Sequence, residues 1–155
     1  MEQHSIVQLQ LLHPKIKDKA IGAYNEAVKA TPIGVHPYID QTYRTFAESD
    51  KIYAQGRTTP GEIISNAKAG QSYHNYGLAL DFNLQINGKD IWDETNPNWI
   101  TVVNIFKSHG FSWGGDWKGF KDHPHLEIRL GYNWKDLFVL YNEGKFIPGT
   151  HYVDI

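Results

Sequence analysis

The chain has 155 residues, a formal net charge of −2 and no cysteine. This length fits one compact domain, and the lack of cysteine excludes disulfides, iron–sulfur clusters, thiolate zinc sites and a cysteine nucleophile. The 41% hydrophobic and 21% charged residues exclude an intrinsically disordered chain, and the nearly neutral charge argues against duplex nucleic acid as a partner. We therefore expect residues 1–155 to form a single globular domain.

The first half of the chain is predicted to be mainly helical. Residues 14–31 carry apolar side chains at helical spacing after a His-Pro start, and residues 38–42 favour a short strand. Residues 45–55 begin with a Thr-x-x-Glu capping box and end before a glycine, which predicts a second helix. The Thr-Pro-Gly-Glu segment at 59–62 repeats the capping signal and predicts another helix start.

The second half predicts a small sheet. Residues 78–86 alternate between apolar and polar side chains, and so do residues 125–130. The dipeptide Asn87-Gly88 favours a tight hairpin turn, with a returning strand over 90–92.

Two helices and a loop complete the prediction. Residues 97–109 follow an Asn-Pro start and end at a glycine, and a last helix is expected over 134–142. The loop over 113–117 is rich in glycine and tryptophan. The apolar face of the first of these helices is expected to consist of Trp99, Ile100, Val103 and Phe106. Helices at the start, central strands and hairpin connections predict an α+β fold with a small antiparallel sheet.

Polar side chains that can bind a metal fall on one face of this sheet. Asp81 faces away from the apolar residues of the first strand, and His125 does so on the second. If the strands pair, the two lie side by side, and His74 can fold back to the same point. Two histidines and one aspartate suit zinc and leave a fourth position for water. A solvated sheet face without metal has the same pattern, and other divalent ions bind such sets.

Further polar residues lie close to this set in the sequence. Asp122 precedes His125 by three residues and is either a general base or a turn residue. Glu127 shares the strand face of His125 and can hold its ring by a hydrogen bond. His123 shares that face and can take either role.

Several segments together resemble a known family. The stretch Ser72–Asp81, S-Y-H-N-Y-G-L-A-L-D, matches the S-x-H-x-x-G-x-A-x-D signature of the zinc peptidase family of D-alanyl-D-alanine carboxypeptidases and L-alanyl-D-glutamate endopeptidases. Residues 122–127 resemble its D-x-P-H-x-E motif, and residues 113–117 resemble its W-G-G-D-W loop. Residues 43–45 and 53–58 resemble its Y-R-T and Y-A-Q-G-R-T segments. The resemblance is greatest to the endopeptidases of phage endolysins and wall-remodelling enzymes.

This resemblance implies the fold of the hedgehog and D-Ala-D-Ala metallopeptidases, with a small central antiparallel sheet flanked by helices. It implies one zinc ion bound by His74, Asp81 and His125, with Asp122 as the general base. Arg44 takes the place of the family arginine that holds the substrate carbonyl or carboxylate.

The resemblance also suggests roles for residues around these. Ser72, Trp113 and Trp117 are expected near the substrate, although the two tryptophans fit core packing equally well, as does the aromatic fraction of 14%. Glu127 is expected to support His125. The resemblance gives Arg57 no role, and the simplest structural expectation for it is an ion pair. The segment 131–155 matches the family less clearly and carries no expected catalytic residue.

The function implied is hydrolysis of the L-Ala–D-Glu bond in peptidoglycan stem peptides. A D,D-carboxypeptidase that removes terminal D-Ala is one alternative. A zinc-stabilised binding module without turnover, as in the hedgehog signalling domain, is another, and a sheet domain without metal is a third.

The cellular setting is also an expectation. No secretory signal and no transmembrane stretch is visible. We therefore expect a monomer that is made in the cytoplasm, does not insert into membranes or bind nucleic acid, and acts on the cell wall in the periplasm or outside the cell after release. The length leaves no room for a separate wall-binding domain.

Overall fold

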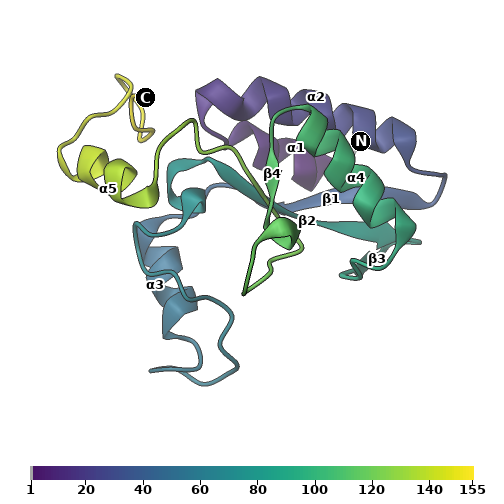
Figure 1. The fold of residues 1–155 in the computed structure, drawn as a ribbon, viewed down its shortest axis with the longest axis horizontal. Coiled ribbons are helices and arrows are strands. Elements are labelled where there is room, and N and C mark those ends of the chain that lie inside the picture. Colours follow the sequence, from purple (N-terminus) through teal and green to yellow (C-terminus); the bar gives the residue numbers. More distant parts are fainter. Residues whose placement is uncertain (1) are drawn as a thin grey trace.

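A five-stranded antiparallel sheet lies at the centre of the protein (Figure 1). The computed structural model describes residues 2–155. The main strands lie in the order β1-β2-β5-β4, and β3 pairs with β2. Their bounds are β1 Val35–Gln41, β2 Ala79–Ile86, β3 Lys89–Ile91, β4 Ser112–Trp113 and β5 His125–Glu127.

Residues 2–155 also form five α-helices and two short 3₁₀ turns. The α-helices are α1 Gln3–Gln10, α2 Pro14–Ala30, α3 Phe46–Ala54, α4 Pro97–Ser108 and α5 Trp134–Asn142; the 3₁₀ turns are η1 Tyr73–Tyr76 and η2 Gly114–Asp116. Helix α2 packs against α4 and β1, and α4 also contacts β2. Figure 1 shows α3 and α5 together at the other end of the molecule from α4. Within residues 2–155, no helix has both the length and the apolarity needed to cross a bilayer.

The core lies on one face of β2. Leu80, Phe82 and Leu84 are fully buried, and the ring of Phe82 lies 4.5 Å from that of Trp99 in α4. Because successive side chains of a strand point to opposite faces, burial of this apolar set directs Asp81 to the other face. The predicted alternation is confirmed, and it leaves the polar face of β2 to form a site.

Most predicted elements are confirmed. Helix α2 begins at Pro14, α3 follows its Thr45 cap, and α5 has the predicted bounds. The hairpin between β2 and β3 turns at Asn87 and Gly88, with φ of 52° and 78°. Positive φ at both central residues is what the tight turn requires.

One predicted helix start is wrong. Residues 59–62 form no helix, because Thr59 pairs with Gln55 in an isolated bridge and Gly61 has a φ of 120°. Ile63 and Ile64 beyond them are both 57% exposed, so no apolar face is available to stabilise a helix there. A capping signal therefore does not start a helix here, because no helical pattern of apolar residues follows it.

Smaller differences concern burial and length. In α4, Val102 is fully buried and Ile100 is 42% exposed, so Ile100 does not belong to the apolar face. Strand β5 ends at Glu127 rather than near residue 130, where Leu130 has a left-handed φ of 54° and turns the chain towards α5. Helix α1 was not predicted, and β1 begins three residues before the expected strand.

A buried histidine joins the two ends of the chain. His13 caps α2, where its Nδ1 accepts a hydrogen bond from the Lys15 N–H at 3.1 Å. Its Nε2 donates to the carbonyl of Val153 at 2.8 Å. The ring is fully buried, and burial lowers its pKa below the ordinary value. This geometry requires the neutral imidazole.

The first prediction concerns acid stability. A histidine whose pKa is lower in the folded state stabilises the protein above its unfolded pKa of about 6.5 and loses that contribution as pH falls. The free energy of unfolding of the wild type should therefore decrease from about pH 7 to pH 5. The His13→Asn variant keeps a capping acceptor but does not titrate. Its free energy of unfolding should decrease less over the same range. Urea unfolding at both pH values measures this; equal losses in the two proteins would contradict it.

Candidate active site

The pairing of β2 with β5 brings two of the expected metal ligands together. In this antiparallel pair Asp81 lies directly opposite His125, and Ala79 lies opposite Glu127. The third ligand comes from η1, where the side chain of Ser72 caps the turn and Gly77 ends it with a φ of 68°. A Cβ at Gly77 would lie 2.8 Å from the backbone nitrogen of His13, so only glycine fits this close turn into β2.

The three side chains converge on one point. His74 Nε2 lies 3.3 Å from Asp81 Oδ2, and His125 Nδ1 lies 3.4 Å from Asp81 Oδ1. One ligand atom from each residue lies within 4.8 Å of the others. Asp81 Oδ1 is buried and has no hydrogen-bond partner within residues 2–155. A buried carboxylate oxygen without a donor fits a metal ligand.

Hydrogen bonds fix which nitrogen of each histidine faces this point. His74 Nδ1 donates to the carbonyl of Thr42 at 2.7 Å, which leaves Nε2 free to bind a metal. His125 Nε2 lies 2.8 Å from Glu127 Oε1, which leaves Nδ1 free. Glu127 is 1% exposed and so supports His125 from within the protein, as its position on the strand predicted.

The charges around the position where His74, Asp81 and His125 converge favour a cation. Burial alone would raise the pKa of Asp81, but the imidazoles of His74 and His125 hold it well below its usual range. Burial likewise disfavours the charged form of His125, yet the adjacent carboxylates of Asp81 and Glu127 raise its pKa to about 9. A positive charge is therefore stabilised between these residues, and a divalent metal ion satisfies this preference in place of the proton.

Asp122 stands beside this set on the loop that enters β5. Its Oδ2 lies 3.9 Å from His125 Nδ1, and its side chain is 38% exposed. Burial and the nearby charge of Asp81 raise its pKa. The loop is held by Gly114, whose carbonyl accepts a hydrogen bond from the Asp122 N–H at 3.0 Å. Asp122 is thus a carboxylate of increased basicity next to the metal-binding point.

Arg44 approaches Asp81 from the segment between β1 and α3. Its Nη2 lies 3.8 Å from Asp81 Oδ2, and its side chain is 11% exposed. Gln41 fixes the guanidinium by accepting hydrogen bonds from Nε at 3.1 Å and from Nη2 at 2.6 Å. Gln41 was not predicted from the sequence, because an isolated glutamine at the end of a strand is indistinguishable from a surface residue.

An open cleft of about 700 Å³ gives access to these groups. Ser72 and Trp117 line it together with the metal-binding set, Asp122 and Arg44. The ring of Trp117 lies 5.1 Å from that of His125, so this tryptophan forms a wall of the site. The segment after α3 contributes a further part of the wall that includes Ile64.

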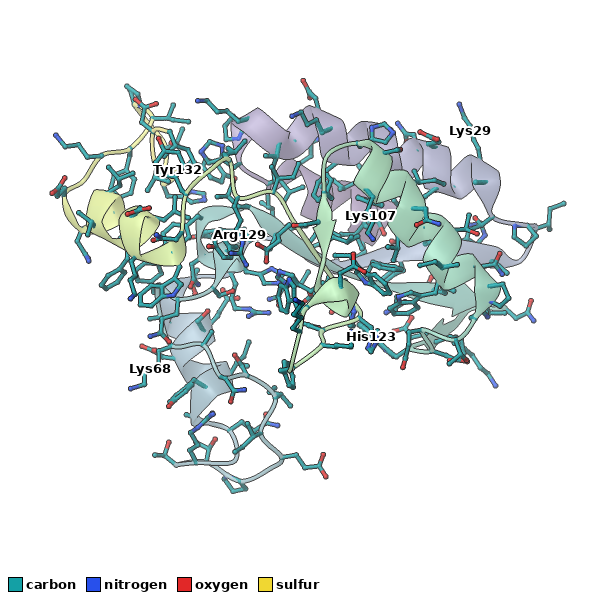
Figure 2. The ribbon with its side chains drawn as sticks, in the orientation of Figure 1. Lys29, Lys68, Lys107, His123, Arg129 and Tyr132 are labelled. Atoms are coloured by element: carbon teal, nitrogen blue, oxygen red, sulfur yellow. The ribbon has the colours of Figure 1, made fainter. Side chains whose placement is uncertain are left out.

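Trp113 and His123, which were candidate site residues in the sequence analysis, do not line the cleft. The indole N–H of Trp113 donates to the carbonyl of His123 at 2.7 Å, and Trp113 packs against the core. The His123 ring lies beside Trp113, with Nδ1 4.0 Å from Glu94. Figure 2 shows His123 on the side towards β3. Both residues therefore shape the loop that carries Asp122.

The expected ion pair of Arg57 is wrong. Its Nη1 donates to the carbonyls of Tyr53 and Ser65, and its Nη2 donates to the side chain of Asn66. The guanidinium also lies 3.8 Å from the centre of the Tyr53 ring. Arg57 thus ties the loop after α3 to the helix through neutral groups, and that loop contributes Ser65 and Asn66 to the cleft wall.

Several known proteins are similar to this chain. A family profile described as D-alanyl-D-alanine carboxypeptidase matches residues 65–128. The peptidoglycan L-alanyl-D-glutamate endopeptidase CwlK of Bacillus subtilis is 48% identical over 127 residues, which cover 76% of this chain and 73% of CwlK. The L-alanyl-D-glutamate peptidase of Listeria phage A118 is 43% identical over 83 residues, or 50% of this chain and 29% of the phage protein.

A solved structure supports the fold. The Serratia marcescens L-Ala D-Glu endopeptidase ChiX superposes with a TM-score of 0.59 at 19% identity, covering 83% of this chain and 88% of ChiX. The α+β fold and the sequence similarity together define a metallopeptidase. The chain belongs to the family of D-alanyl-D-alanine carboxypeptidases and L-alanyl-D-glutamate endopeptidases.

The second prediction concerns Gly114. A Cβ at this position would lie 2.3 Å from the carbonyl oxygen of Asp122, so Gly114→Ala must displace the loop that carries this residue. A displacement of about 1 Å can lower turnover by about 100-fold. We expect a fall in kcat of that order with unchanged metal content, measured by peptide hydrolysis and metal analysis. Gly22→Ala in α2, which lies outside the cleft, is the control. An unaltered kcat in Gly114→Ala would contradict the prediction.

Proposed function

We propose that the protein is a zinc-dependent endopeptidase that cleaves the L-Ala–D-Glu bond in peptidoglycan stem peptides. The observation that carries this proposal is the convergence of His74, Asp81 and His125 beside Asp122 in an open cleft. Its similarity to two L-alanyl-D-glutamate peptidases supports the choice of bond. Action on the cell wall follows from that substrate.

The residues present fit one zinc ion. Two neutral imidazole nitrogens and one carboxylate oxygen are ligands that zinc accepts, and the unpartnered Asp81 Oδ1 is available to bind it. When bound, zinc supplies Lewis acidity and lowers the pKa of a bound water towards neutrality.

Asp122 is assigned the proton transfers. Its carboxylate takes a proton from the attacking water and later gives it to the nitrogen of the leaving D-Glu residue. The pKa raised by burial and by Asp81 makes it a stronger base than a solvated aspartate. The reaction consumes one water and yields a carboxylate on L-Ala and a free amine on D-Glu.

Arg44 is assigned to the scissile carbonyl. Its guanidinium lies next to Asp81 and is held by Gln41, so its charge is in place before the substrate binds. Negative charge develops on the carbonyl oxygen as water attacks, and a fixed donor there stabilises the transition state by about 3–4 kcal/mol.

A second activity is favoured by one observation. The matching family profile is described as D-alanyl-D-alanine carboxypeptidase, so removal of a terminal D-Ala is the alternative reaction. Digestion of a defined stem pentapeptide separates the two. Mass spectrometry should find a fragment that begins with D-Glu, and the fragment should disappear with a chelator and return with zinc. Release of D-Ala would support the alternative instead, and zinc binding without any hydrolysis would support a binding module.

The third prediction concerns the base. Asp122→Asn has nearly the same shape but cannot accept the proton, so kcat should fall by about 10²- to 10⁴-fold. Zinc content should stay near one ion per chain, because Asp122 is outside the proposed ligand set. Turnover at the wild-type rate would contradict the assignment.

The fourth prediction concerns metal binding. His125→Ala removes a ligand and should bind zinc much more weakly, as measured by competition with a chromophoric chelator. His109→Ala is the matched control, because His109 lies at the end of α4 and pairs with Glu26 at 2.7 Å, away from the cleft. Stoichiometric, tight zinc in His125→Ala would overturn the ligand set.

A further inference from the structure

A second guanidinium lines the cleft and has no part in the steps above. Arg129 follows β5 and is 50% exposed, whereas Arg44 is 11% exposed. In Figure 2 Arg129 lies nearer to α5 than His123 does. Arg44 and Arg129 are the arginines among the residues that line the cleft.

Two contacts fix Arg129 next to the metal-binding residues. Its Nε donates to Oε2 of Glu127, whose other oxygen is bonded to His125. Its guanidinium carbon lies 4.5 Å from the ring centre of Tyr73, the neighbour of His74 in η1. One carboxylate therefore separates Arg129 from a ligand imidazole, and the guanidinium is held in place before any substrate arrives.

The free edge of this guanidinium suits a carboxylate. Within residues 2–155, the hydrogen bond from Nε to Glu127 is the one formed by the Arg129 side chain, so both Nη groups are available. A pair of guanidinium N–H groups binds a carboxylate through two parallel hydrogen bonds, which are stronger than bonds between neutral groups.

The proposed substrate presents such a group close to the scissile bond. D-Glu is joined to the next residue through its γ-carboxyl group, so its α-carboxylate is free and is attached to the carbon that carries the scissile nitrogen. Asp81 and Asp122 line the same cleft and would repel this anion. A guanidinium that pairs with the α-carboxylate offsets this repulsion.

We propose that Arg129 binds the α-carboxylate of D-Glu and thereby selects a free acid over its amide. This inference rests on the proposed function. It makes Arg129 a specificity-determining residue that contacts the substrate, in addition to supporting Glu127.

The test uses two synthetic peptides, N-acetyl-L-Ala-γ-D-Glu-L-Lys and the same peptide with D-isoglutamine in place of D-Glu. Wild-type kcat/KM should be about 10- to 100-fold higher for the free acid, which is the range of a hydrogen bond to a charged group. Arg129→Gln should lower kcat/KM for the acid by that factor more than kcat/KM for the amide, so that the preference for the acid is lost. Arg129→Lys should keep part of the preference, because it keeps the charge but loses the paired donors.

The controls separate this role from simple support of the site. Lys19→Gln removes one exposed positive charge from α2, outside the cleft, and should keep the wild-type preference. Zinc content and melting temperature are measured for every variant. Equal losses on both peptides in Arg129→Gln, or no preference in the wild type, would overturn the inference. A wild-type enzyme that cleaves neither peptide would overturn the proposed function itself.

Discussion

The site depends on the register between β2 and β5. Asp81 lies opposite His125 only because the two strands pair as they do, and a slip of one residue would turn one of these side chains into the core. The register is fixed from the other face of the sheet, where Leu80 and Leu126 are fully buried opposite each other. The hydrophobic core therefore sets the metal-binding geometry, because the same alternation that buries the leucines directs the carboxylate and the imidazole into the cleft.

The groups around His74, Asp81 and His125 stabilise a positive charge at the site. The carbonyl of Thr42 and the carboxylate of Glu127 orient the two imidazoles, and Arg129 compensates the charge of Glu127 at its other oxygen. A metal ion bound by His74, Asp81 and His125 would take the place of a proton on them. Buried groups of this kind are costly when unpaired, and their mutual pairing explains how a small sheet can hold them.

The sequence predicted the parts of this arrangement that follow from local patterns. Alternation in β2, the Asn87-Gly88 turn and the caps of α3 and α4 are each short-range signals, and each was confirmed. The predicted helix start at residues 59–62 was wrong because a local bridge between Gln55 and Thr59 replaces it and no buried apolar face follows the capping signal. Trp113 and Gln41 could not be placed, since whether a tryptophan lines a cleft or fills the core depends on contacts between distant segments. The family motifs contributed residue roles that no spacing rule supplies.

X-ray absorption at the zinc edge tests the central claim most directly, namely that His74, Asp81 and His125 form one metal site. The wild-type protein loaded with one equivalent of zinc should show scattering from two imidazole rings, with nitrogen and oxygen ligands at about 2.0–2.1 Å. A spectrum with three imidazoles, or with oxygen ligands alone, would contradict this ligand set and with it the arrangement of the cleft around a single metal ion.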